Sequence, residues 1–365
     1  MCWRRLSNLR RISATALIAL YLTTAARADG VPVARTLRDA VSDRAAVRVS
    51  PGTLEILKAV GSLAPHVVGL FRDPIGFKQT ANGDYYVFDR RGHTVFRVDR
   101  PGDVAKKLVQ IGAEDGRLIE PSAFDVAFNG SFAVADAPNG RERVQIFDAA
   151  GVRTGGFILP GRGAIRVVSG SISLNGVGTL SFNGQSMLMS HPETGWLITQ
   201  YGSAGTPIRS VGLLRKTGHE ADRDLHLALN SGIPIADPNG GFYFVFMAGA
   251  PAFRKYNAQG ELVYERIVQG REIDSLIEEI PDRWPRRGGG ELPLVAPTVR
   301  TAAVDRSGRL WISFVIPYSY VYDSAGEKVR TVQFRGAGII SPSSLWFDER
   351  GRLLVTPGCY EFSPG

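Results

Sequence analysis

Residues 121–151 read PSAFDVAFNGSFAVADAPNGRERVQIFDAAG, and this stretch decides the fold class. Asn129-Gly130 precedes one short apolar run, Phe132–Asp136, and Gly151 closes a second run, residues 143–148. Glycine accepts a positive φ angle and asparagine tolerates it better than most residues, so Asn-Gly is typical of a tight hairpin turn. The stretch therefore predicts short antiparallel strands joined by turns.

The same pattern of a residue-Gly turn followed by an apolar run occurs six times along the chain. The six turn glycines lie 47, 54, 56, 68 and 43 residues apart. This is the spacing of propeller blades, each of which is a small four-stranded sheet. The six copies are residues 82–88, 129–135, 183–189, 239–245, 307–313 and 350–355.

A second turn keeps the same register in every copy. Downstream of each first turn, a strand with aromatic or charged residues ends at another glycine. These glycines are Gly102, Gly151, Gly202, Gly260, Gly326 and Gly365. The agreement of both turns in all copies predicts an all-β fold, a six-bladed β-propeller.

The last copy stops at Gly365, where the outermost strand of its blade should begin. Residues 53–60 alternate apolar with polar side chains and precede the first blade. We expect this N-terminal segment to be the outer strand of the C-terminal blade, because it would close the ring and remove an open sheet edge. The propeller is therefore expected to span residues 53–365.

Two segments outside the repeat are expected at the N-terminus. Residues 1–28 combine a basic head, an apolar stretch and the small-x-small site Ala26-Arg27-Ala28, which predicts a secretory signal peptide. Residues 29–52 show no periodic pattern and are expected to be a flexible leader.

An insertion, 271–297, lies between blades four and five, with a helical spacing of apolar residues over 272–280. It should lie on the face that bears the loops between second and third strands.

The charge and the cysteine content of the chain limit which cellular compartment and which partners are expected. Loss of residues 1–28 removes five of the 43 basic side chains and none of the 35 acidic ones, so the net charge falls from +8 to +3. A nucleic-acid partner is therefore not expected, since it would require a concentrated basic face. Cys359 is the only cysteine after residue 28, so no intrachain disulfide is expected. We expect a periplasmic or secreted protein with no stable membrane insertion after signal cleavage.

The stretch 121–151 resembles an NHL repeat through Asn129-Gly130, the Phe132–Asp136 run, Asn139, residues 143–148 and Gly151. Residues 74–102 are similar, the last two copies more loosely, and copies three and four only in their turns and periodicity. The resemblance implies an exported bacterial six-bladed propeller of NHL type. That family holds interaction modules and some enzymes, so the fold does not decide the function.

Candidate binding residues lie in the loops between second and third strands, which all open on one face. They are Arg90, Arg91 and His93 in blade one, Arg141 in blade two and His191 in blade three. Arginines beside aromatic neighbours suit an anionic or sugar-bearing partner. We expect a binding module for a protein, peptide or glycan. Two strand-end acids, Asp89 and Asp136, are instead expected to pair with an arginine inside their blades, as Arg143 could do.

An alternative is a metal-dependent hydrolase or lyase, lactonase-like, acting at the channel mouth. Calcium would require a Glu, Asn and Asp such as Glu120, Asn175 and Asp237, whereas catalytic zinc requires about three converging ligands and only two histidines share equivalent loops. No metal site, catalytic residue or cofactor is therefore predicted, with Ca or Zn expected only under this alternative. The sequence leaves open whether the chain is an enzyme.

Overall fold

The computed structural model describes residues 54–159, 167–169, 172–174, 179–286 and 293–364, all within one compact unit, Thr36–Gly365. The expected signal peptide and leader lie outside the described residues, as does Asn175. No helix in the described ranges has both the length and the apolar character needed to cross a membrane.

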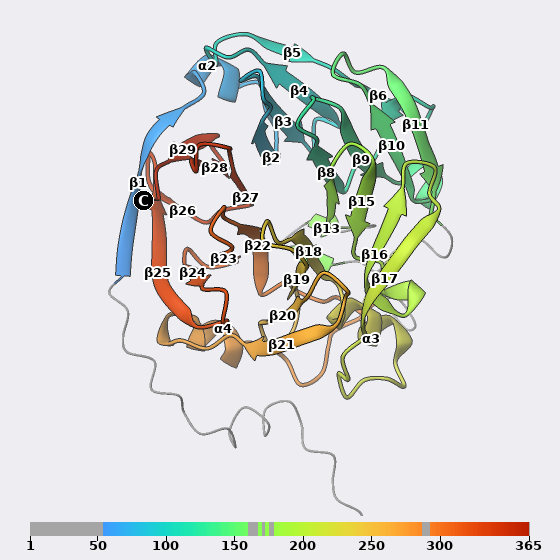
Figure 1. Cartoon of the computed structure of the whole chain (residues 1–365), viewed down its shortest axis with the longest axis vertical. Helices are drawn as coiled ribbons and strands as arrows, with labels where there is room; N and C mark the ends of the chain where they lie inside the picture. The colour runs from blue at the N-terminus through green and yellow to red at the C-terminus, as the bar shows by residue number, and fades with distance from the viewer. Residues whose placement is uncertain (1–53, 160–166, 170–171, 175–178, 287–292, 365) are drawn as a thin grey trace, which may run out of the picture. The chain divides into compact units, whose positions relative to one another are not determined.

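Four separate antiparallel sheets of four strands each make up most of the unit (Figure 1). Each follows the chain from an inner to an outer strand, which is the order expected for propeller blades. Blade one is β2 (Pro74–Gln79), β3 (Tyr85–Asp89), β4 (Thr94–Val98) and β5 (Ala105–Lys107); blade two is β8 (Ala123–Val126), β9 (Phe132–Asp136), β10 (Arg143–Phe147) and β11 (Arg153–Ile158). Blade three is β14 (Leu180–Phe182), β15 (Ser186–Met189), β16 (Trp196–Gly202) and β17 (Pro207–Leu213); blade four is β18 (Gly232–Ala236), β19 (Phe242–Phe246), β20 (Ala252–Tyr256) and β21 (Leu262–Ile267).

The remaining strands of the C-terminal part join in one nine-stranded sheet. Its order is β22-β23-β24-β25-β1-β29-β28-β27, with β26 also paired to β25. The strands are β1 (Leu54–Ser62), β22 (Val299–Val304), β23 (Leu310–Phe314), β24 (Ser319–Tyr322), β25 (Lys328–Arg335), β26 (Ile339–Ile340), β27 (Ser344–Phe347), β28 (Leu353–Thr356) and β29 (Tyr360–Phe362). The sequence predicted six separate sheets, whereas the described residues form four separate blades and this larger sheet.

The first strands of these sheets contact one another in a closed succession. β2 contacts β8, β8 contacts β14, β14 contacts β18, β18 contacts β22, β22 contacts β27, and β27 contacts β2. The first strands therefore surround a common axis and the later strands lie outside them, which makes the chain an all-β propeller. Two small two-stranded sheets complete the strands: β6 (Gln110–Ile111) with β7 (Arg117–Leu118), and β12 (Val167–Ser169) with β13 (Ile172–Leu174).

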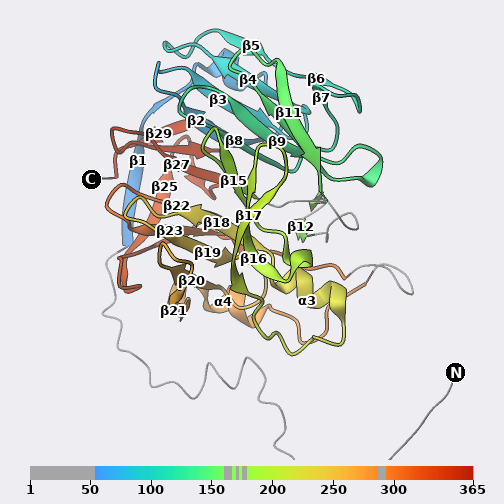
Figure 2. The ribbon, with the colours of Figure 1, turned by 45° about the vertical axis from the view of Figure 1, so that its right-hand side comes forward.

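The N-terminal strand β1 lies between two other strands of the nine-stranded sheet (Figures 1 and 2). Its second half, from Ala59 to Ser62, pairs antiparallel with β29, which confirms the predicted pairing with the C-terminal strand. Its first half, from Leu54 to Lys58, instead runs parallel to β25, a contact that the sequence did not predict. Both edges are thus covered, and the Glu55 carboxylate also accepts two hydrogen bonds from Arg330.

Short helices lie in the connections. They are α2 (Pro65–Val68), α3 (Arg223–Leu229) and α4 (Asp274–Glu278), with 3-10 turns at Pro138–Gly140, Pro192–Thr194 and Arg271–Ile273. The 272–280 helix expected in the insertion is shorter than predicted, since its first turn is 3-10. The β-bridge between Pro297 and Ala248 joins the insertion to the β19–β20 loop, on the expected face.

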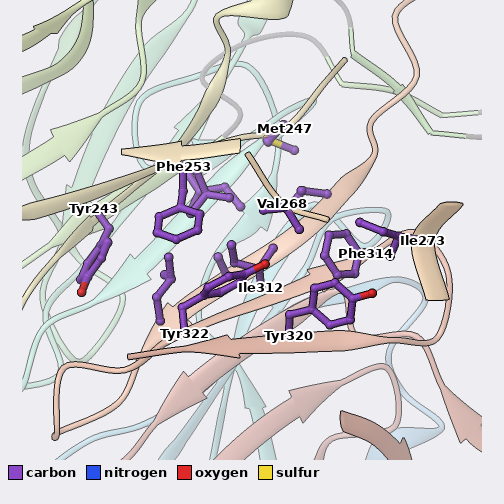
Figure 3. Close-up of a cluster of buried hydrophobic side chains, with 14 of the residues drawn as sticks. Tyr243, Met247, Phe253, Val268, Ile273, Ile312, Phe314, Tyr320 and Tyr322 are labelled. Carbon is purple, nitrogen blue, oxygen red and sulfur yellow. The ribbon is translucent and has the colours of Figure 1, made fainter. Parts of the chain in front are cut away.

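The largest cluster of buried side chains joins blade four to the neighbouring β22–β24 strands (Figure 3). Phe253 and Tyr322 approach to 4.7 Å between ring centroids, and Phe314 meets Tyr320 at 5.0 Å, edge to face. Ile273 of the insertion is fully buried in the same cluster. Within the described residues Cys359 is a free thiol, so this packing between neighbouring sheets, rather than a disulfide among them, holds the ring together.

Candidate functional site

One face of the propeller carries all five binding residues that the sequence predicted. Each first strand begins there and each second strand ends there; in blade one, Pro74 pairs with Asp89. The loops between second and third strands therefore open on this face, which we call the Arg90 face. They are residues 90–93, 137–142, 190–195, 247–251, 315–318 and 357–359.

Arg90 directly follows the second strand of blade one, β3, and its guanidinium already pairs with a carboxylate. Its Nε donates to the Asp73 carboxylate at 2.9 Å, and its Nη2 lies 2.8 Å from the same oxygen. Arg300, the second residue of β22, lies close enough that the Arg90 charge, after burial, lowers the pKa of the Arg300 guanidinium. Arg90 and Arg300 thus repel each other electrostatically, while Asp73, Asp89 and Glu120 carry negative charge in the same part of the face.

Two further arginines are direct chain neighbours of Arg90 and Asp73. Arg91 is exposed, and so is Arg72, which precedes Asp73. Neither side chain forms a hydrogen bond or ion pair within the part of the chain that the structure describes. Both guanidinium groups are therefore available to a partner, whereas the Arg90 guanidinium would have to bind the partner and Asp73 at the same time.

The two predicted histidines do not add positive charge at neutral pH. Burial lowers the pKa of His93 and that of His191, so both imidazoles favour the neutral form. The Nδ1 atom of each is buried without a hydrogen-bond partner among the described residues. His93 also adopts a left-handed φ of 50°. The prediction of a basic rim that includes these histidines is therefore corrected: its charge comes from arginine.

The strand-end acids behave as predicted in blade two but not in blade one. Arg143 Nε donates to Asp136 Oδ1 at 2.8 Å and its Nη2 donates to Oδ2 at 3.0 Å, a bidentate pair inside the blade. In blade one the residue opposite Asp89 is Thr94, not an arginine. Asp89 instead accepts backbone N–H groups from Arg72, Asp73 and Gly92.

Arg141 lines a cavity of about 330 Å³ at the outer part of blade two. The Arg141 side chain is exposed and has no ion pair among the described residues. Arg143 and Arg153 also line the cavity, and both reach Asp115 at 3.3 Å. The cavity wall therefore carries three guanidinium groups and one exposed carboxylate.

The predicted residues thus separate into three places. Arg90, Arg91 and His93 lie in one loop of blade one, Arg141 lines the cavity of blade two, and His191 is buried in blade three. Sequence reasoning missed Arg300 and Arg153. Arg300 occupies a first strand and Arg153 a fourth strand, so a search confined to loops could not find them. A search of strand ends for arginines would have found both.

The ligand set of the metal alternative is not brought together. Glu120 precedes the first strand of blade two on the Arg90 face, whereas Asp237 follows the first strand of blade four, at the opposite end. Asp237 is also paired with Lys255 at 2.8 Å. Within the described ranges, no group of three or more His, Cys, Asp or Glu side chains is arranged to hold a metal ion.

Cys359 is fully buried in the last loop of the Arg90 face, and burial raises the pKa of its thiol. The thiolate is the reactive form of cysteine, so this burial favours a packing role for Cys359 over a nucleophilic one.

Comparison with known proteins does not assign the chain to a family within the β-propellers. No family model matches the chain, and no curated protein matches it in sequence. Many solved structures match. They include the WD40 β-propeller domain of Doa1 (8% identity, TM-score 0.45, 84% of this chain and 97% of that one), virginiamycin B lyase from Staphylococcus aureus (9%, 0.48, 83% and 96%) and a protein of unknown function from Bacteroides caccae (15%, 0.43, 71% and 81%). These similarities are low, so the assignment to the β-propellers rests on the strand order of this chain.

Proposed function

We propose that this chain is an exported six-bladed propeller of NHL type that binds an anionic protein, peptide or glycan on its Arg90 face. The observation that carries the proposal is the set of arginines there. Arg91 and Arg141 are exposed without a charge partner among the described residues. The Arg90 charge, after burial, also lowers the pKa of the Arg300 guanidinium. Guanidinium groups bind planar anions through two parallel hydrogen bonds, so carboxylate, phosphate and sulfate are the matching ligand groups.

Six blades follow if the nine-stranded sheet is divided at β1. β22–β25 is then blade five, and β27, β28, β29 and the second half of β1 form blade six. The cyclic contact of six first strands supports this division. In this arrangement β1 joins blades five and six into one sheet, which accounts for four separate sheets rather than six.

Export is proposed from the sequence features of residues 1–28. A rigid propeller outside the inner membrane would meet acidic polysaccharides and proteins, which fits a face with exposed arginines. Mass measurement of the exported protein tests this: the mature chain is expected to begin at Asp29, and a retained N-terminal segment would contradict the assignment.

Binding can be tested with arrays of anionic glycans and acidic peptides. The wild type is expected to bind a member of one array, and binding should weaken as salt rises, because exposed charge pairs are screened. The double variant Arg91→Ala, Arg141→Ala should bind about two- to tenfold more weakly with an unchanged melting temperature. Arg90 is left intact, since its removal would leave the Asp73 carboxylate without its ion-pair partner.

The matched control is Arg100→Ala, Arg306→Ala, which removes two exposed arginines from turns at the opposite ends of the blades. It should leave binding unchanged. Equal loss in both double variants would mean that only net charge matters, and binding by no member of either array would refute the proposal.

A further inference from the structure

We infer that the cavity of blade two is a subsite for a hexuronate residue, a sugar acid within an anionic glycan. The inference deepens the proposed function and rests on it. The cavity is bounded by Pro138, Asn139 and Arg141 from the β9–β10 loop, by Gly156, Phe157 and Ile158 from β11, and by residues 113 and 115. Its volume of about 330 Å³ lies at the lower end of ligand pockets, which suits one ring rather than a chain segment.

The arginines of the cavity differ in how many partners their guanidinium groups already have. Besides its ion pair with Asp136, Arg143 donates to the carbonyl oxygens of Glu114 and Arg117 at 3.2 and 3.0 Å. It therefore holds the wall in place and is not available to a ligand. Among the described residues Arg153 has one ion pair, with Asp115, and its side chain is 32% exposed. Arg141 has none among the described residues. A carboxylate is therefore expected to be bound by Arg141, with Arg153 assisting.

Asp115 restricts what else the ligand can be. Its side chain is 67% exposed at the same cavity, so a second negative charge on the ligand would be repelled there. A hydroxyl group can donate to it, and the exposed Asn139 amide offers both a donor and an acceptor. The wall therefore requires an acid at one end of the ligand and hydroxyl donors at the other. A hexuronate carries both, whereas a glutamate side chain or a sulfate ion carries no such hydroxyl.

An apolar wall completes the match. Phe157 packs against Tyr201, with ring centroids 5.6 Å apart, and Phe157, Ile158 and Pro138 all line the cavity. A Cβ at Gly156 would lie 2.4 Å from the Val144 carbonyl oxygen, and φ there is +145°, so β11 presents no side chain at this point. The C–H face of a sugar ring can cover such apolar atoms, which a small ion would leave exposed to water.

The probes that test this are trigalacturonate, its methyl ester, inorganic sulfate and hexaglutamate, each titrated calorimetrically into the mature chain. Trigalacturonate should bind. Its methyl ester keeps the sugar rings but loses the negative charges, so it should bind at least about tenfold more weakly. Arg141→Ala should reduce the affinity for trigalacturonate about tenfold. Arg141→Lys should reduce it less, because lysine keeps the positive charge but lacks the two parallel N–H donors of the guanidinium. Arg306→Ala is the matched control, and melting temperatures confirm that each variant is folded.

The outcomes separate the subsite from the function. If trigalacturonate binds and Arg141→Ala and Arg153→Ala leave its affinity unchanged while Arg91→Ala lowers it, the subsite is wrong and the proposed function stands. If sulfate or hexaglutamate binds as tightly as trigalacturonate with the same dependence on Arg141, the uronate assignment is wrong. If no anionic probe binds, both proposals fall.

Discussion

Blade one and blade two carry the same acid at the end of the second strand and use it in different ways. Asp136 meets Arg143 across the strand pair, whereas Asp89 meets Thr94 and accepts backbone N–H groups instead. In blade two the arginine continues to Asp115 and so helps to form the cavity wall. The repeat thus determines where the acid lies, and the residue opposite determines what the acid binds.

The difference also separates an arginine that pairs inside its blade from one that we propose to bind a ligand. The sequence already separates Arg141, in the loop, from Arg143, expected to pair with a strand-end acid inside the blade. In the structure Arg141 is exposed and unpaired among the described residues, whereas Arg143 is buried. The ion pair between Arg143 and Asp136 confirms the expected pairing.

The largest effect on this comparison is expected from Arg143→Ala. The Asp136 side chain is completely buried, so loss of its partner leaves an uncompensated charge. Breaking a buried ion pair in this way costs about 3–5 kcal/mol of unfolding free energy. Denaturant titration should show this loss, and Arg90→Ala in blade one should cost less, because Asp73 is partly exposed. Equal losses would contradict the distinction between the two blades.

Asp89→Asn should cost less than Asp136→Asn. In blade one the amide can still accept two of the three backbone hydrogen bonds, and the remaining N–H loses its acceptor, for about 1–3 kcal/mol. In blade two the same change removes the charge that Arg143 requires. Denaturant midpoints of the two variants measure the order, and a larger effect in blade one would reverse the interpretation.

The His93 loop of blade one is expected to make stability depend on pH. The folded pKa of His93 lies below the unfolded value of 6.5, so its neutral form is favoured on folding. Its contribution is therefore complete above pH 6.5 and is lost as the pH falls through the folded pKa. His93→Asn, which tolerates the left-handed φ, should lose less stability between pH 7 and pH 5 than the wild type. Identical pH profiles of thermal stability would exclude this role.

The smallest effect on stability is expected from Arg91→Ala and Arg141→Ala, taken singly. Both side chains are exposed without partners among the described residues, so melting temperatures should stay within about 1–2 °C of the wild type. Ligand affinity, rather than stability, should distinguish them: a uronide should be sensitive to Arg141 more than to Arg91. A clear loss of stability in either variant would mean that its guanidinium is structural.

Much of the fold was predictable because its signals are local. The turn glycines at 83, 130, 184, 240, 308 and 351 all adopt positive φ, as the hairpin pattern required. The alternation in residues 54–60 also predicted a strand. The helix α3 was missed, because residues 218–230 read as polar and charged, whereas Leu225, Leu227 and Leu229 are buried. A short helix held by tertiary packing has a weak sequence signal.

The site was less predictable than the fold. Loop position correctly placed Arg90, Arg91, His93, Arg141 and His191 on one face. It could not foresee that burial holds both histidines in the neutral form or that Arg90 is paired with Asp73. Such properties depend on desolvation and on residues distant in sequence.

The sequence by itself determined the β-strand repeat and the turn positions, because hairpin turns and alternating patterns depend on neighbouring residues. The missing outer strand of the last copy also predicted that the N-terminal strand pairs with the C-terminal one. Only the tertiary structure decided that β1 also pairs with β25 and that Asp115 joins Arg143 and Arg153 at one cavity. These are contacts between segments far apart in the chain. Ring closure brings such segments together, and no local pattern encodes which charges then meet.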